Sequence, residues 1–503
     1  MKLLKRKSGS LVVLALAGLP LAALAQDYGV DMPAEPAPGV RFPTPEAEID
    51  AWIRADPQDT DAIHAHAWGI WAGLTKPVEG EGAYARLTYQ TWLTKADVID
   101  VFTGEAPEDQ FRLGESNQMF KHGLVDGFIA NNAQEKKDGT EPVKNAAGII
   151  VNTDVLENVA YSPPSAQYLL DTGTGKPEVL DRLLELGDKV RFPDAAVNVK
   201  PVYKLITDDR ITEWTGEDGR TRRLYAFTAW PGEPDLANWT PDMKQGGYPE
   251  TLWQQCVYVD LDLQGPTTST GVDVNCKSPS EGNIYSVDDF IAVDLKKEDA
   301  AFVNKATGES RDLTAGKTSI ALLVAMHVTS RETTQWTWQT FWWEADAARP
   351  NSPSSAAVAS ARPDTLTTQA AHYAMAPAYS MLVPAQPLVG GKNVGALVTA
   401  FNPYLEAGFG TPVIGITETV QIPDGSGGWT TTTTDMGIQT NCMTCHGLAA
   451  WGGRGTGYAA NFYVPRDYWV FDTALDVDFA WSVQAIGEAV EKAEKKKAEA
   501  TSD

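Results

Sequence analysis

The chain has 503 residues, of which 43% are hydrophobic and 9% aromatic, so it can bury a large core and is long enough for two or three domains. Lys and Arg number 41 against 66 Asp and Glu, a formal net charge of −25. This acidic balance excludes nucleic acid as an expected partner and favours a basic protein, because like charges repel.

The first 25 residues have the pattern of a secretory signal peptide. Lys2–Lys7 supply a basic start, Leu11–Leu24 an apolar stretch, and Ala23–Ala25 the small residues of a cleavage site. The apolar stretch is interrupted at Pro20 and is shorter than the roughly 20 residues of a membrane-spanning helix. We predict cleavage by a Sec-type pathway before Gln26, a periplasmic or secreted location, and no transmembrane anchor in the mature chain.

The elements expected next are helices followed by strands. Thr44-Pro45-Glu46 places a capping residue before a proline, so a helix is expected to begin there. Apolar residues recur at helical spacing from Thr60 to Leu74, and again after Pro177. A terminal helix or frayed tail is expected over 486–500. Strands are expected at Leu87–Leu93, Ala195–Lys200, Leu224–Trp230, Cys256–Leu263, Ile320–Thr329, Thr334–Trp343 and Val394–Phe401.

The motif that carries chemistry is Cys442-Met-Thr-Cys445-His446. Its two thiols can add to the two vinyl groups of a haem, and the adjacent histidine is then held beneath the iron as proximal ligand. A zinc site would need a second ligand pair at suitable spacing, and a thioredoxin-like site a βαβ unit, and neither pattern is found nearby. The sequence therefore predicts one covalently bound haem c, with His446 ligating the metal.

Cys256 and Cys276 are the two remaining cysteines. Disulfides persist outside the cytoplasm, so a bridge between them is expected, with two buried free thiols as the alternative. Closing this loop would stabilise the fold by about 3 kcal/mol in the chain-entropy model.

Asn441–Gly447 resembles the haem-binding segment of c-type cytochromes. Three further pieces are similar to a class of large exported bacterial proteins of the cytochrome c family: Phe192–Lys200, Met326–Val328 and Trp336–Phe341. The resemblance implies a periplasmic redox protein and gives no substrate. In small soluble cytochromes c a methionine after the motif supplies the sixth ligand, but none of the 57 residues after His446 is Met or His.

Four upstream residues are therefore candidates for the sixth iron ligand. His327 lies in an apolar strand, where a buried ring needs a hydrogen bond or a metal. His372 and Met375 share another segment, with Met381 nearby, and ligation by either methionine would raise the reduction potential. Each also has an ordinary structural explanation, because histidines bond to backbone and methionines fill cores. The tryptophan-rich segment Trp336–Trp343 either lines a pocket or packs in a core.

Together these signals predict an α+β chain with a helical N-terminal region, a large β-rich domain and a C-terminal haem-bearing segment. The expected regions are a signal peptide (1–25), a proline-rich lead (26–43), a mainly helical region (44–132), a β-rich domain (147–346), a linker or long loop (347–365), a haem c region (366–485) and a charged helical tail (486–503). The expected function is electron transfer with a basic redox partner. A haem-dependent oxidase or peroxidase with an open sixth site, and a haem-based sensor or binding protein, are the alternatives.

Overall fold

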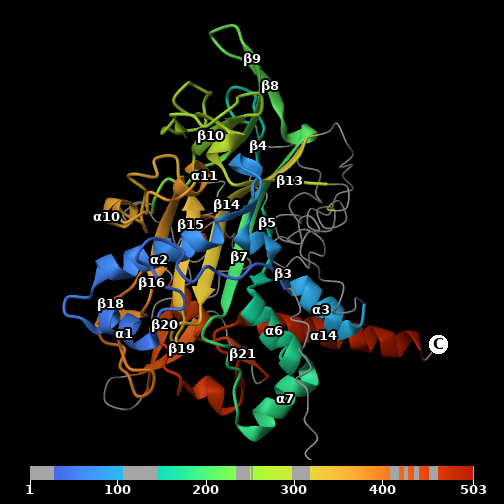
Figure 1. Cartoon of the computed structure of the whole chain (residues 1–503), viewed down its shortest axis with the longest axis vertical. Coiled ribbons are helices and arrows are strands. Elements are labelled where there is room, and N and C mark those ends of the chain that lie inside the picture. The colour runs from blue at the N-terminus through green and yellow to red at the C-terminus, as the bar shows by residue number, and fades with distance from the viewer. Residues whose placement is uncertain are drawn as a thin grey trace, which may run out of the picture.

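A large β-sheet forms the centre of the molecule, and a smaller sheet lies at its upper end in Figure 1, with helices and a C-terminal segment around the large sheet. The computed structural model describes residues 28–105, 144–152, 155–233, 250, 253–296, 299, 318–407, 418–423, 429–434, 441–452 and 463–501. Helices and strands are mixed along this part of the chain, which confirms the predicted α+β class.

The larger sheet has eight strands among the described residues, in the order β16-β15-β14-β7-β6-β3, with β13 paired to β14 and β5 to β7. These strands are β3 Leu93–Thr94, β5 Leu156–Glu157, β6 Ala160–Tyr161, β7 Val197–Thr207, β13 Ala292–Asp294, β14 Ser319–Ser330, β15 Thr337–Trp343 and β16 Tyr373–Ala378. The central strand β14 is buried at almost every position. A strand that is covered on both faces has a nearly continuous apolar sequence, as β14 does.

One face of this sheet packs against α2 (Thr60–Leu74), and α1 (Glu46–Arg54) packs against α2. α2 begins after Asp59, whose side chain accepts a hydrogen bond from the Ala62 N–H at 3.1 Å. On β15, the ring of Phe341 stacks on Trp71 of α2 with centroids 4.3 Å apart. The predicted start at Thr60 is confirmed, whereas α1 begins one residue later than expected, with Pro45 and not Thr44 as its N-cap.

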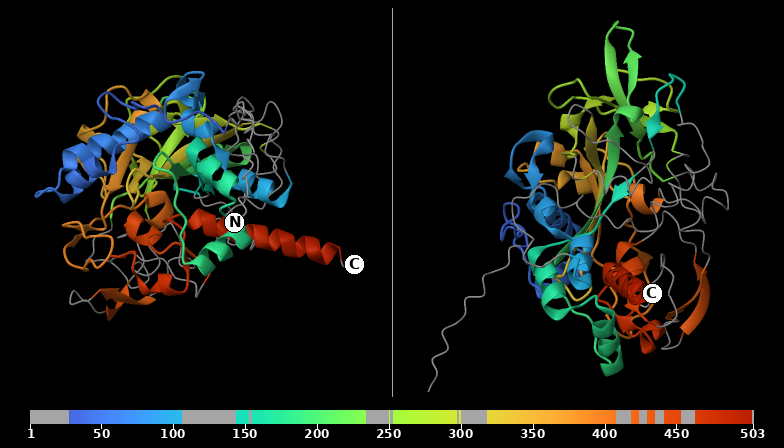
Figure 2. Two further views of the ribbon diagram at one scale, coloured as in Figure 1. Left: turned by 60° about the horizontal axis from the view of Figure 1, so that its bottom comes forward. Right: turned by 90° about the vertical axis from the view of Figure 1, so that its right-hand side faces the viewer.

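The opposite face packs against the C-terminal segment. Residues an odd number apart on a strand point to opposite faces, so Trp338 of β15 points away from Phe341 and α2. The Trp338 ring contacts His446 at the end of α13 (Cys442–His446), with centroids 4.4 Å apart. The right-hand view of Figure 2 shows the N-terminal helices and the C-terminal segment on opposite sides of the sheet.

The smaller sheet has six strands among the described residues, in the order β11-β10-β9-β4, with β12 paired to β10 and β8 to β9. They are β4 Val151–Asn152, β8 Thr212–Thr215, β9 Thr221–Thr228, β10 Gln255–Asp260, β11 Asp273–Val274 and β12 Ile284–Ser286. The predicted disulfide is present: Cys256 of β10 is bonded to Cys276, just after β11, with Cα atoms 5.0 Å apart.

The remaining helices lie around the two sheets. They are α3 Lys95–Thr103, α6 Pro163–Thr172, α7 Pro177–Leu186, α10 Ala356–Ser360, α11 Thr368–Ala371, the π-helix η9 Pro403–Ala407 and α14 Trp481–Ala500. Four two-stranded pairs complete the fold: β1 Pro77–Glu79 with β2 Arg86–Leu87, β17 Leu382–Val383 with β18 Ala396–Leu397, β19 Glu418–Pro423 with β20 Trp429–Thr434, and β21 Ala450–Trp451 with β22 Leu475–Asp476. The C-terminal end of α14 projects beyond the body (Figure 2).

Four expected strands differ from the structure. The strand expected at Ala195–Lys200 is β7, which begins at Val197 and continues to Thr207. Leu87–Leu93 is two short strands joined by a 3-10 turn at Thr88–Thr91, because Gln90 and Thr91 hydrogen-bond to nearby backbone instead of a strand ladder. β15 begins at Thr337, since Trp336 has φ 59° and ends a turn. In Val394–Phe401 only Ala396–Leu397 is strand, and the preceding Gly395 has φ 130°.

The main hydrophobic core joins residues from Tyr28 to Val490, across the regions expected to be separate. A second, smaller core lies in the smaller sheet and includes Leu224, Cys256 and Ile284. Residues 347–365 include α10, and the Trp68 indole of α2 donates a hydrogen bond to the Val358 carbonyl at 2.8 Å. This segment is therefore packed on the helical layer. The expected signal peptide lies outside the described residues. Within them, no helix combines the length and apolar character needed to cross a bilayer.

Candidate functional site

α13 is a single helical turn fixed at its start by Asn441. The Asn441 side chain accepts a hydrogen bond from the Thr444 N–H at 3.1 Å and donates one to the Val398 carbonyl at 2.5 Å. The Cys442 N–H also donates to the Ala400 carbonyl, at 3.1 Å. These bonds hold the motif against the chain that follows β16, and a helical turn brings positions 442 and 445 to neighbouring places on its surface.

His446 is held with one ring nitrogen engaged and the ring neutral. Its Nδ1 lies 2.9 Å from the Phe479 carbonyl oxygen, so Nδ1 carries the proton and donates it. Burial lowers the pKa of His446 to about 4, with smaller effects from neighbouring charges. Nε2 is thereby left with its lone pair, which is the state that a metal ligand requires.

The sheet face beneath α13 carries a row of polar residues. The strand register places Lys200 of β7 opposite His327 of β14, and His327 opposite Thr340 of β15. Residues directly across an antiparallel pair share a face, so all three point toward the side that Trp338 occupies. Lys200 pairs with Glu157, Nζ to Oε2, at 2.9 Å. The sheet thus presents charged and polar groups to the motif.

Glu406 of η9 lies against this row of polar residues on the sheet. Its Oε1 lies 2.9 Å from His327 Nε2, and its Oε2 accepts a hydrogen bond from the Asn402 N–H at 2.6 Å. Burial, the largest single effect, would raise the pKa of Glu406, but His327 and hydrogen bonds from backbone N–H groups together lower it. The Asn402 amide also donates to Thr340 Oγ1 at 2.7 Å. His327 and Glu406 therefore lie within ion-pair distance of each other.

The pair lies directly beside the motif. Ligand atoms of His327, Glu406 and Cys442 all lie within 4.8 Å of one another. Cys442 is buried and Cys445 is partly exposed, and neither is in a disulfide. Burial, followed by the charge on Glu406, raises the pKa of both thiols, so both are protonated at neutral pH.

No family profile matches the sequence, and no curated protein or solved structure shows significant similarity to it. The site's chemistry therefore has to be argued from its own residues. Cys442 and Cys445 are unbridged and three apart, and His446 follows them with its Nδ1 engaged. These residue types fit covalent haem c attachment, in which Cys442 and Cys445 would hold the group and His446 would ligate its iron.

Of the four candidates, Met381 lies against Gly447, directly after the motif, and its sulfur accepts a hydrogen bond from the Val464 N–H at 3.2 Å. Of the other three, the structure brings only one to the motif. Met375 lies opposite Phe341 in the β15–β16 register, so it shares the face covered by α2. His372 precedes β16, at the end of β15 remote from Trp338, with its Nε2 3.5 Å from Asp289 Oδ1. Burial lowers the pKa of His372, and Asp289 opposes this shift. Among the three, only His327 lies beside Cys442.

Two contributors to the site could not be identified from the sequence. Glu406 lies in a short irregular segment with no periodic pattern. Phe479 contributes a backbone carbonyl, which no residue type specifies. Trp338 was expected either to line a pocket or to pack in a core, and its ring contacts His446.

Proposed function

We propose that this chain is an exported monohaem c-type protein that carries its haem on Cys442, Cys445 and His446 and serves electron transfer. The observation that carries the proposal is the 2.9 Å contact from His446 Nδ1 to the Phe479 carbonyl, which leaves Nε2 for a metal. When bound, haem supplies an iron that cycles between Fe(III) and Fe(II). The chain's own residues would hold the haem and orient its histidine ligand.

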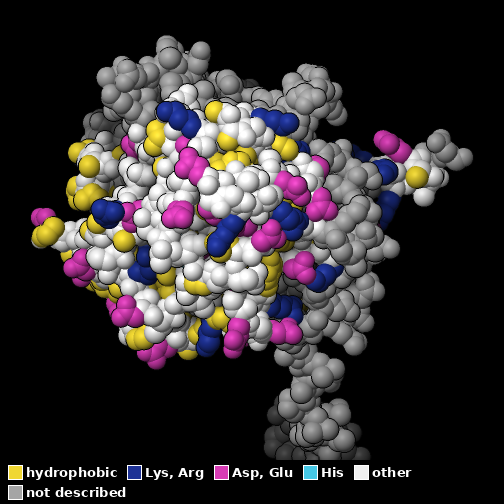
Figure 3. Space-filling model, turned by 90° about the horizontal axis from the view of Figure 1, so that it is seen from above, with side chains coloured by type: hydrophobic (Ala, Val, Ile, Leu, Met, Phe, Trp, Pro, Cys, Tyr) yellow, Lys and Arg dark blue, Asp and Glu magenta, His cyan; other side chains and the backbone are white. Residues whose placement is uncertain are grey.

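Export is part of this proposal. Covalent haem is attached outside the cytoplasm, and the predicted signal peptide would deliver the chain there. The Cys256–Cys276 disulfide is compatible with an oxidising compartment. The partner proposed is a basic redox protein, steered by the net charge of −25. Acidic and basic side chains are interspersed on the face shown in Figure 3, so the steering would come from the whole charge and not from one patch on that face.

Haem staining of a denaturing gel, together with intact mass, tests the proposal. The purified mature protein should stain and should exceed its polypeptide mass by one haem. The Cys442→Ser, Cys445→Ser double variant should lose both signals. The matched control is Cys256→Ser with Cys276→Ser, which removes the same number of cysteines from the disulfide of the smaller sheet and should keep the haem. A mass equal to the bare polypeptide refutes the proposal.

A second candidate function is a haem oxidoreductase with an open sixth site. The observation that favours it is the 2.9 Å contact between His327 Nε2 and Glu406 Oε1. Histidine usually ligates haem iron through Nε2, so this contact would have to break before His327 could ligate. Carbon monoxide binding distinguishes the electron-transfer protein from the oxidoreductase. An iron with an open sixth site binds carbon monoxide rapidly, which changes the spectrum of the reduced protein, whereas an iron with a protein sixth ligand binds it slowly or not at all.

A further inference from the structure

The Phe479 carbonyl that orients His446 belongs to a strained stretch of backbone. Asp478 and Phe479 have φ values of 55° and 65°, so two successive non-glycine residues adopt the left-handed conformation. Asp tolerates this region, but a bulky residue such as Phe rarely adopts it. Such strain persists only where the surroundings fix the backbone from several sides, and it concentrates at functional sites.

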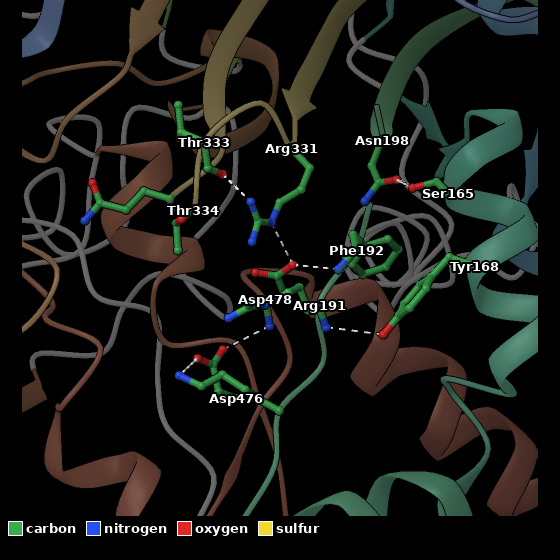
Figure 4. A network of polar contacts seen from close by, with 12 residues as sticks. Ser165, Tyr168, Arg191, Phe192, Asn198, Arg331, Thr333, Thr334, Asp476 and Asp478 are labelled. Atoms are coloured by element: carbon green, nitrogen blue, oxygen red, sulfur yellow. Dashed lines mark hydrogen bonds and ion pairs between the residues drawn. The ribbon is translucent and has the colours of Figure 1, made fainter. Parts of the chain in front are cut away.

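A buried ion pair fixes this backbone. Asp478 Oδ2 lies 3.1 Å from Arg331 Nε and accepts a hydrogen bond from the Phe192 N–H at 2.9 Å (Figure 4). The Arg331 and Asp478 side chains are only 6% and 9% exposed. The Asp478 N–H donates in turn to Asp476 Oδ1, at 2.9 Å.

Arg331 ties this carboxylate to the larger sheet. It follows β14 directly, and its guanidinium donates to the Thr333 carbonyl at 2.8 Å in the turn before β15 (Figure 4). The backbone N–H of Arg331 donates to the Ala196 carbonyl just before β7, also at 2.8 Å. The ion pair therefore connects the tip of the β14–β15 hairpin, the chain leading into β7 and the C-terminal segment.

Phe479 is also held through its ring. The Arg466 guanidinium lies 4.3 Å from the Phe479 ring centroid, and the Trp338 ring lies 6.2 Å away on the side of His446. Arg466 and Trp338 hold the Phe479 ring, and Arg331 holds the preceding residue, Asp478. These contacts together fix the direction of the Phe479 carbonyl. That carbonyl decides which nitrogen of His446 carries the proton.

We propose that Arg331 and Asp478 are positioning residues for His446: their ion pair holds the Phe479 carbonyl, which keeps the proton on Nδ1 and Nε2 free as the ligand atom. The ligand role rests on the proposed function, but the proton position does not. A hydrogen bond to the second ring nitrogen of a ligating histidine raises its basicity and tunes the metal. Loosening the pair weakens that bond, makes His446 a poorer donor to Fe(III) and raises the midpoint potential.

The test uses full-length mature protein carrying Arg331→Gln, with Arg331→Lys as the conservative variant. Arg331→Gln should have a higher midpoint potential than the wild type and a shifted absorption spectrum. Arg331→Lys should recover part of the shift, because an ammonium can reach Asp478 but cannot also bond the Thr333 carbonyl. The control is Arg222→Gln, whose guanidinium is 17% exposed and pairs with Asp218 and Asp260 in the smaller sheet. It should lose stability and keep the wild-type potential.

A second readout does not need haem. Ring-nitrogen chemical shifts of His446, in full-length protein made under haem limitation, should report the Nδ1–H tautomer in the wild type and a mixture of tautomers in Arg331→Gln. Asp478→Asn keeps an acceptor oxygen and tolerates the left-handed backbone, so it replaces Arg331→Gln as the test if that variant does not accumulate. Its midpoint potential and His446 tautomer should change in the same direction as in Arg331→Gln, by a smaller amount.

A wild-type potential together with a wild-type tautomer in these variants overturns the inference. A wild-type protein without covalent haem refutes the proposed function instead. In that case the tautomer measurement alone decides whether Arg331 and Asp478 position His446.

Discussion

Glu344 should make the stability of the protein depend on pH between about 5 and 8. This side chain lies just beyond β15 and is 5% exposed. Its Oε2 accepts long hydrogen bonds from the Trp342 indole, at 3.3 Å, and from the Asn351 N–H, at 3.4 Å. Burial raises the pKa of Glu344 from 4.5 to about 8, and these donors offset only part of that effect.

The sign and size of this pH dependence of stability follow from the pKa values of Glu344 in the unfolded and folded states. A carboxyl whose pKa is higher in the folded state contributes stability that is fully present below about pH 4.5 and is lost as the pH rises through about 8. Each pH unit between these values costs about 1.4 kcal/mol. The wild type should therefore lose about 3 kcal/mol of unfolding free energy between pH 5 and pH 7.5 from this group alone.

Glu344→Gln removes the titration while keeping the size of the side chain and an oxygen for both donors. Its unfolding free energy at pH 7 should exceed that of the wild type by up to about 3 kcal/mol, with little difference at pH 5. Urea denaturation at the two pH values measures both quantities. Glu185→Gln, at an exposed position in α7, is the control and should follow the wild type. If Glu344→Gln keeps the wild-type pH slope, the linkage argument is wrong.

Three further predictions concern the disulfide, the distal pair and the surface charge. Replacing Cys256 and Cys276 by serine should lower the unfolding free energy by about 3 kcal/mol, because the bridge closes a 20-residue separation, and a wild-type denaturation midpoint would contradict this. His327→Ala should shift the Soret band and increase carbon monoxide binding if His327 lies on the distal side, whereas an unchanged spectrum and affinity would exclude that role. Association with a basic redox partner should slow as salt rises, since the Debye length is about 10 Å at 0.1 M, and a salt-independent rate in stopped-flow mixing would rule out steering.

The sequence predicted well the elements that local rules determine. Helical spacing marks α2, and the proline marks the start of α1 to within one residue, although Thr44 does not cap it. The pairing of Cys256 with Cys276 followed from having only two cysteines outside the motif. The strands β14 and β15 were evident from apolar and aromatic runs, although the turn at Trp336 shortened the second.

The arrangement around the motif could not be predicted, because it depends on register between distant strands. Lys200, His327 and Thr340 form a row only because β7, β14 and β15 pair as they do, and a shift of one residue would turn His327 to the other face. The same register separates His327 from Met375, two candidates that the sequence ranked without a geometric criterion. Glu406 adds a partner from an irregular segment that carries no periodic signal.

The burial of Cys442 bears on the order in which the molecule matures. Its thiol is buried in the folded chain, and its sulfur contacts the Ala400 carbonyl at 3.0 Å. If the chain carries the proposed haem, attachment needs access to both thiols and would have to precede packing of α13 on the sheet. Among the described residues, the last strand of the larger sheet, β16, ends at Ala378, before the motif in the chain. In the proposed haem protein, attachment and the packing of α13 would then be coupled late events, and a chain that packed too early would be trapped without its cofactor.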